Sequence, residues 1–327
     1  MDSFKQNLRS KKYVQYIDCC AKTYQFCKER VIIISDLNID YIIDMCKMDF
    51  NNGCKGIHEQ IGGCAYNAAT YFKNNDLFPV IIGSVGNDLN GQKIIDELNR
   101  KEIYAFLDRI TFPTGVCNIA YCGNQRLLYC KQENANKYSI ASIKKALTHI
   151  NMQSNDVVFI TAHIFLNASY QDINELLGFI KNRNVKIILD VVPHDIFVDN
   201  KLLNSIFDIL TIKLDIVISN LGTLLDYCDT NNVHNKESEF LTDEDIRIIM
   251  SKINADMFVI RYGKTGTSKQ AIIKRINSSK YKIIENIKTD YENVNIDEKT
   301  GYGEILTAKI IKKYLFAQIN ELKGEVQ

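Results

Sequence analysis

Short, uninterrupted runs of β-branched and other apolar residues recur along this chain. The segment between one run and the next is long enough to contain a helix. The first run is VIIISDL, at residues 31–37. Runs of this length without polar alternation are typical of strands that are buried on both faces, as in parallel sheets. The later runs are PVIIGSV (79–85), DVVFIT (156–161), VKIILDVV (185–192), DIVIS (215–219) and DMFVIRY (256–262).

The stretches between these runs are typical of helices. Strands that alternate with helices predict an α/β fold, with three α/β/α layers around a mainly parallel sheet. The first 30 residues predict a polar helix outside this core, and the core domain is expected over residues 31–323. The clearest helices are predicted over 63–74, 89–101, 139–151, 170–182, 202–210, 242–254 and about 303–322.

Two segments break the alternation and predict hairpins. One surrounds Asn51-Asn52-Gly53, the strongest short hairpin signal in the chain, and the other surrounds Gly123-Asn124. Together, residues 41–61 and 112–133 are expected to form a small β-sheet lid that excludes water from a ligand. Its uncovered surface favours a homodimer through the lid.

The charge balance excludes several classes of protein. The chain of 327 residues has 40 Lys and Arg against 39 Asp and Glu, a net charge of +1, so it lacks the basic excess of proteins that bind nucleic acid or membrane surfaces. No apolar run is long enough to span a bilayer, and the N-terminus does not read as a secretory signal. The 10 cysteines have no metal spacing, which favours reduced thiols in a cytoplasmic protein, and no metal ligand is assigned directly.

Two motifs suit a polyhydroxylated ligand. Asn38 and Asp40 follow the first strand and share a face if extended, so they can donate to and accept from sugar hydroxyls. Gly62-Gly63 opens a helix of small residues that includes Asn67, and adjacent glycines let a ligand approach the backbone. The alternatives are a turn or cap for the first motif, and a tight turn with Asn67 on a packed face for the second.

Two later motifs suit phosphate. Gly263-Lys264-Thr265-Gly266 follows the last apolar run and can wrap a phosphate group. Gly301-Tyr302-Gly303 opens a helix, where backbone N–H groups attract anions, and the Glu304 carboxylate beside it can accept a proton. An ordinary helix start with an acidic first turn is the alternative. The dinucleotide spacing is absent at Gly83–Gly91, where Asp88 is expected to cap the next helix.

Taken in order, these motifs resemble the ribokinase or PfkB family of sugar and nucleoside kinases, from about residue 31 to 313. The resemblance implies a ribokinase-like fold and transfer of phosphate from ATP, with Mg²⁺, to a hydroxymethyl group of a small-molecule sugar or nucleoside. It implies that Asn38, Asp40, Gly62, Gly63 and Asn67 bind the substrate. It further implies that Asn220, Gly263, Lys264, Thr265 and Gly266 line the nucleotide site, that Gly301 and Gly303 form the anion hole, and that Glu304 is the catalytic base.

The sequence also departs from the family pattern. Glu304 stands where the family has its catalytic Asp, and Asn220…Thr223 lacks the acid of the family's N-x-x-E motif, which helps to arrange Mg²⁺ and phosphate. Arg261 replaces a Thr, and Tyr302 replaces an Ala. Three hypotheses therefore stay open: a working kinase, a catalytically impaired pseudokinase that binds a ligand or regulates a partner, and an enzyme of the same fold with different chemistry.

Overall fold

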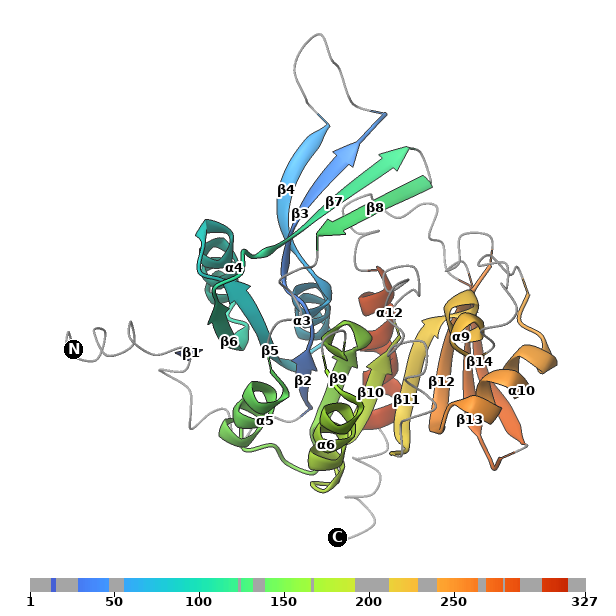
Figure 1. Cartoon of the computed structure of the whole chain (residues 1–327). Coiled ribbons are helices and arrows are strands. Elements are labelled where there is room, and N and C mark those ends of the chain that lie inside the picture. The colour runs from blue at the N-terminus through green and yellow to red at the C-terminus, as the bar shows by residue number, and fades with distance from the viewer. Residues whose placement is uncertain are drawn as a thin grey trace. The chain divides into compact units, whose positions relative to one another are not determined.

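The computed structural model divides into two compact units, one of Met1–Asn151 with Asn295–Gln327 and the other of Met152–Val294. Each unit is described by itself below, and Figure 1 labels the elements. The structure describes residues 13–15, 29–46, 56–122, 125–131, 139–165, 168–191, 212–228, 240–263, 269–278, 280–288 and 302–316, some of them as backbone only.

The first unit contains a sheet with the strand order β1-β6-β5-β2. Strands β2 (Arg30–Ile34), β5 (Phe78–Gly86) and β6 (Tyr104–Ile110) are parallel, which confirms the first two predicted strands. Strand β1 (Tyr13–Gln15) pairs antiparallel with β6, so these three residues are not helical as expected. The rest of the N-terminal 28 residues lies outside the described part of the chain.

Helices flank this sheet where the sequence predicts them. They are α3 (Cys64–Asn74), α4 (Leu89–Arg100) and α5 (Ile140–His149). Helix α12 (Tyr302–Ile310) returns from the far end of the chain to pack against α3, and a π-helical turn, η4 (Ile311–Phe316), continues it. Three alanines and Phe72 form the buried face of α3, and the small side chains let neighbouring elements approach closely. Residues 317–322 of the predicted helix lie outside the description.

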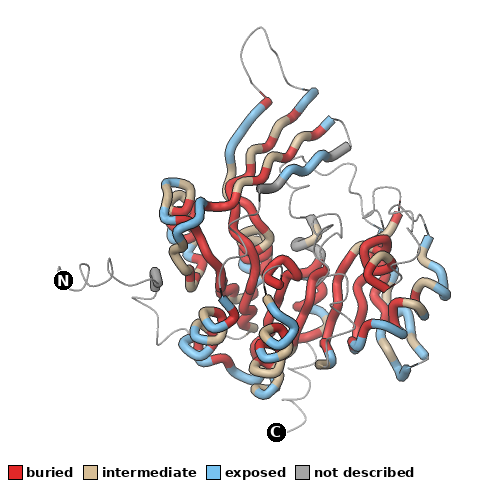
Figure 2. Tube along the Cα trace, viewed as in Figure 1, coloured by how far each residue is buried: buried red, intermediate tan, exposed pale blue. Residues whose placement is uncertain are grey.

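A second, four-stranded sheet in the same unit forms the predicted lid. Figure 2 shows buried and more exposed residues alternating along one of its strands, Gly115–Cys122. Its order is β4 (Ile57–Gly62), β3 (Asn38–Asp44), β7 (Gly115–Cys122) and β8 (Gln125–Lys131). Both predicted hairpins are antiparallel pairs, and β3 joins them by pairing in parallel with β7. The turn residues 51–53 and 123–124 lie outside the described part.

The lid differs from the sequence expectation in its cysteine chemistry. Cys117, at 4% exposure, packs with Ile42, Ile119 and Tyr121 in the buried face of this sheet. Cys117 is disulfide-bonded, whereas we expected reduced thiols throughout. Cys46, Cys64, Cys122 and Cys228 do carry free thiols, as expected.

The second unit has parallel strands in the order β9-β10-β11-β12, extended by an antiparallel hairpin, β13-β14. All four predicted parallel strands are confirmed, and the hairpin was not predicted. The strands are β9 (Val157–Thr161), β10 (Lys186–Asp190), β11 (Leu214–Asn220), β12 (Ala255–Tyr262), β13 (Lys269–Arg275) and β14 (Tyr281–Lys288). The helices are η1 (Ala162–Phe165), α6 (Tyr170–Lys181), α9 (Leu221–Cys228) and α10 (Asp243–Lys252).

The predicted helix over residues 202–210 lies outside the described part of the chain. Within the described residues, no helix has both the length and the apolar character needed to cross a membrane.

Candidate active site

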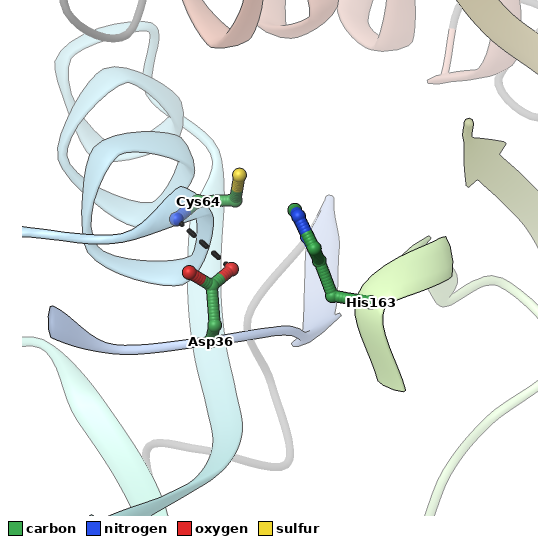
Figure 3. A group of neighbouring side chains, drawn as sticks. All are labelled: Asp36, Cys64 and His163. Atoms are coloured by element: carbon green, nitrogen blue, oxygen red, sulfur yellow. Dashed lines mark hydrogen bonds between the residues drawn. The ribbon is translucent and has the colours of Figure 1, made fainter. Parts of the chain in front are cut away.

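Asp36 organises the junction between β2, the lid and helix α3. It lies two residues after β2, and its Oδ1 accepts a hydrogen bond from the backbone N–H of Cys64 at 3.3 Å (Figure 3). Its backbone carbonyl accepts from the N–H of Ala65 at 3.0 Å, so Asp36 serves two amides of the first turn of α3. A negative side chain is favoured at a helix N-terminus, where the amides lack partners within the helix.

Gly63 lets this junction close. It precedes α3 with φ of 86°, a region that favours glycine, and a Cβ atom there would lie 2.6 Å from the Asp36 carbonyl oxygen. Because Gly63 has no side chain to cap α3, Asp36 supplies the cap from 27 residues earlier in the chain. Gly63 is therefore a place of close approach between backbone segments, and its contact with a substrate stays a prediction.

Asn38 and Asp40 lie on the same face of β3, as predicted. Asn38 Nδ2 donates to Asp36 Oδ2 at 2.7 Å, which fixes the orientation of the amide. Its Oδ1 is buried and has no hydrogen-bond partner within the described part of the chain. Asn38 pairs with Gly62 on the neighbouring strand, and a Cβ atom at Gly62 would lie 2.0 Å from Asp40 Oδ2. The structure thus brings Asn38, Asp40 and Gly62 together.

Asn67 lies in the first turn of α3, three residues after Cys64. It lines a cavity of about 440 Å³ on this unit, together with Gln60 and Ile61 of β4 and residues of α3 and α4. On the wall of the cavity the Tyr66 hydroxyl donates to Glu97 at 2.9 Å. The placement of Asn67 beside the lid strand is compatible with the role that the sequence predicts, which stays a prediction.

Helix α12 carries the residues predicted to handle the transferred phosphate. Gly303 is partly buried, and its carbonyl oxygen accepts from Thr307 Oγ1 at 2.9 Å. Glu304 belongs to the backbone of α12, but its side chain lies outside the described part of the structure, as does Gly301. Because α12 packs against α3, the helices that carry the predicted base and the predicted substrate residue Asn67 are neighbours in one unit.

In the second unit two of the predicted nucleotide residues, Asn220 and Gly263, lie at the carboxyl ends of β11 and β12. Asn220 ends β11, and its Oδ1 is buried without a hydrogen-bond partner in the described structure. Gly263 follows β12 with φ of 111° and is buried. Lys264, Thr265 and Gly266 lie outside the described residues. Parallel sheets bind ligands at this edge.

An ion pair that the sequence did not predict occupies the same edge. Arg261 Nη2 lies 3.6 Å from Asp190 Oδ2, and the two side chains are 10% and 11% exposed. Burial raises the pKa of the Asp190 carboxyl, and the charges of Arg261 and His163 offset part of that rise. Sequence spacing gives no signal for this pair, because the residues lie on strands that are not consecutive in the sheet.

No family model matches the sequence, and no curated protein matches it either. Solved structures do match. Ribokinase from Giardia lamblia superposes with a TM-score of 0.64 at 15% identity, covering 87% of this chain and 83% of that one. Adenosine kinase from Anopheles gambiae gives 0.63 at 13%, covering 89% and 92%. Escherichia coli phosphofructokinase-2, in complex with fructose-6-phosphate, gives 0.61 at 13%, covering 87% and 86%.

The chain has a ribokinase-like fold. The resemblance seen in the sequence motifs is therefore confirmed at the level of the fold, including the separate small sheet. A sugar kinase of this fold from Pyrococcus horikoshii was solved in complex with ATP.

At the carboxyl edge of the second unit, the described residues of this ribokinase-like chain offer few ligands for a protein-held Mg²⁺ ion. A Mg²⁺ site in a protein usually uses one or two carboxylates besides phosphate oxygens and water. At the carboxyl edge of the second unit, the described strands end in one carboxylate, Asp190, and Arg261 engages it. Thr223 fills a buried position in α9 where the family motif has its acid.

Proposed function

We propose that this chain transfers the γ-phosphate of ATP to a hydroxymethyl group of a small sugar or nucleoside. The observation that carries the proposal is the buried Asn38 Oδ1, which lacks a partner in the described structure and lies on the same strand face as Asp40. A buried acceptor without a partner costs about 1–3 kcal/mol, which a ligand hydroxyl would recover. The polar groups of Asn38 and Asp40 are the kind that recognise a polyol.

Each residue has an expected role. In the first unit Asn38, Asp40 and Asn67, with the Gly62-Gly63 backbone, hold the acceptor. Glu304 accepts the proton of the attacking hydroxyl, because a carboxylate of nearly the same intrinsic pKa as Asp keeps the needed basicity. Gly301 and Gly303 present backbone N–H groups to the transferred phosphoryl group.

The second unit is expected to bind ATP through Asn220, Gly263, Lys264, Thr265 and Gly266. The solved Pyrococcus horikoshii complex supports ATP as the ligand of this fold. Mg²⁺ is expected to accompany the nucleotide, bound chiefly by phosphate oxygens and water.

The decisive variant is Glu304→Gln, because the amide keeps the shape of the side chain but cannot accept the proton. We expect kcat to fall about a hundredfold or more while the KM for the acceptor changes little. The measurement is phosphate transfer from ATP across a panel of sugars and nucleosides. Glu304→Asp is the matched control, because it keeps the carboxylate and moves it by roughly 1 Å, enough to lower the rate without removing the base.

Loss of the N-x-x-E acid favours a second candidate, a pseudokinase that binds a ligand without turnover. Thr223 is buried in α9 and has no carboxylate to help to arrange a metal. If the wild-type protein shows no transfer but is stabilised by an acceptor, the pseudokinase becomes the better description. If neither transfer nor stabilisation by millimolar ATP and Mg²⁺ is found, the kinase proposal is wrong.

A further inference from the structure

Polar side chains form a buried row across one face of the sheet in the second unit. Arg261 on β12 lies in register with Asn220 on β11 and with Gln270 on β13. Residues in register on neighbouring strands point to the same face. Asp190 lies in register with Ile218, two residues before Asn220, and therefore shares that face.

The guanidinium of Arg261 extends over the end of β11. Strand β11 separates β12 from β10, yet Arg261 Nη2 comes within 3.6 Å of Asp190 Oδ2 on β10. This separation is longer than an N–H···O hydrogen bond, so the pair is an ion pair without the two-pronged contact that Arg makes with a well-placed carboxylate. The charged group is thus held at the carboxyl edge, next to the end of β11.

The row faces away from the aromatic side chains that cover the other side of β12. Lys269 Nζ lies 6.0 Å from the centre of the Tyr262 ring and 5.1 Å from that of Phe240. Because side chains alternate along a strand, Arg261 points to the opposite face from Tyr262.

Gln270 gives the second, independent observation. Its side chain is 0% exposed, and neither its Oε1 nor its Nε2 has a hydrogen-bond partner within the described structure. Asn220 Oδ1, on the other side of Arg261, is also buried without a partner there. Buried polar groups are nearly always hydrogen-bonded, so the unpartnered Gln270 amide and the unpartnered Asn220 oxygen, on either side of a buried guanidinium, point to a polar ligand.

We propose that Asn220, Arg261 and Gln270 bind a phosphate group, whose negative charge Arg261 balances without a metal ion. The guanidinium fork matches phosphate oxygens and Gln270 Nε2 adds N–H donors, while Asn220 Oδ1 and Gln270 Oε1 can accept from a P–OH group of a protonated phosphate. The Asp190 carboxylate competes with phosphate for Arg261, and burial, which raises the pKa of this carboxyl, weakens that competition. Only the identification of this phosphate as part of the nucleotide rests on the proposed function.

The test is calorimetric titration of the whole chain with inorganic phosphate and inorganic triphosphate, in EDTA at fixed ionic strength. We expect both anions to bind wild-type protein without Mg²⁺, and Arg261→Gln to weaken binding about tenfold or more. The matched control is Arg275→Gln, which removes the same charge from a partly buried arginine that donates only to backbone carbonyls in the described structure. It should change the affinity less than about twofold.

Two further variants separate a ligand site from a structural ion pair. Asp190→Asn should tighten phosphate binding, because it removes the competing carboxylate. Gln270→Leu should raise the melting temperature of the free protein, since it removes an unsatisfied buried amide, and should nevertheless weaken phosphate binding. This variant keeps the test valid even if Arg261→Gln does not fold.

Three results would overturn the proposal: no binding of either anion to the wild type, equal loss in Asp190→Asn and Arg261→Gln, or no effect of Gln270→Leu on affinity. The last result would mean that water, and not phosphate, forms the hydrogen bonds of these buried polar side chains. Since no acceptor and no ATP are present, an absence of kinase activity leaves this measurement unaffected. Phosphate binding without turnover would uphold the site and favour the pseudokinase.

Discussion

At Gly62 the absence of a side chain decides where the Asp40 carboxylate can lie. Asp40 is 3% exposed, so it cannot swing into solvent to make room for a methyl group at Gly62. We expect Gly62→Ala to displace Asp40 and to remove the stabilisation that a bound sugar or nucleoside gives. The measurement is the shift of the melting temperature with each ligand of the panel.

Gly178→Ala is the control for this variant. A Cβ atom at Gly178, in α6, would lie 3.6 Å from its nearest neighbour, Ile212 Cδ1, which is ordinary contact. The change should stabilise the helix by about 0.5–1 kcal/mol and leave ligand shifts unchanged. If both variants keep the full rise of the melting temperature that the ligand gives, Asp40 does not bind the acceptor.

The positions of single residues in the fold were predictable from the sequence where their signal is local, and their roles stay predictions. Asn38 and Asp40 follow a buried strand and Gly62-Gly63 precedes a helix, so short motifs identify them. The capping role of Asp36 was not predicted, because the helix that it caps begins 28 residues later in the chain. Gln270 was not predicted as a site residue because a glutamine next to a lysine is expected to be exposed. Only the pairing of β13 with β12 places it beside Arg261.

The Asp88 side chain links helix α4 to Thr114, the residue that precedes lid strand β7. It caps α4 by accepting from Gly91 N–H at 2.8 Å, and it also accepts from the N–H and hydroxyl of Thr114 at 2.7 and 2.6 Å. Asp88→Asn replaces one accepting oxygen with an NH₂ group that opposes these donors. We expect a loss of about 1–2 kcal/mol in the free energy of unfolding, measured by urea denaturation.

The acid dependence of stability gives a second measurement on the same variant. Burial alone would raise the pKa of Asp88, but the hydrogen bonds from Thr114 and Gly91 lower it overall. A carboxyl with a lowered pKa in the folded state stabilises the protein above its unfolded pKa, and this contribution is lost as pH falls through the folded pKa. Asp88→Asn should therefore make the free energy of unfolding fall less steeply as the pH is lowered through the acid range.

Whole strands were predicted well where both of their faces are buried. The parallel strands have continuous apolar runs because residues on both of their faces are buried. Strand β6 and the β13-β14 hairpin were missed, since charged residues such as Asp108, Arg109 and Lys274 interrupt their apolar pattern. Strand β1 is three residues long, too short for any periodicity to show.

The lid leaves apolar surface on its outermost strand. Leu127 and Tyr129 of β8 are 74% and 71% exposed, and they share the face opposite to that of Ile42 and Ile119. We propose that a second copy of the chain covers this face. Wild-type protein should then form dimers by light scattering, and Leu127→Glu should shift them toward monomers.

Leu128→Glu is the matched control, because Leu128 lies on the other face of the same strand. It should leave the dimer intact. A wild-type protein that is monomeric throughout a concentration series, or two variants that dissociate equally, would contradict the proposed interface.

The return of residues 295–327 to the first unit has a consequence for biosynthesis. Helix α3 is made early, but its partner α12 leaves the ribosome only after residues 152–294 of the other unit have been translated. Until then, the surface of α3 that α12 covers is exposed in the nascent chain. The second unit is contiguous in sequence and can fold first, so chaperone dependence during translation should concentrate on the first unit.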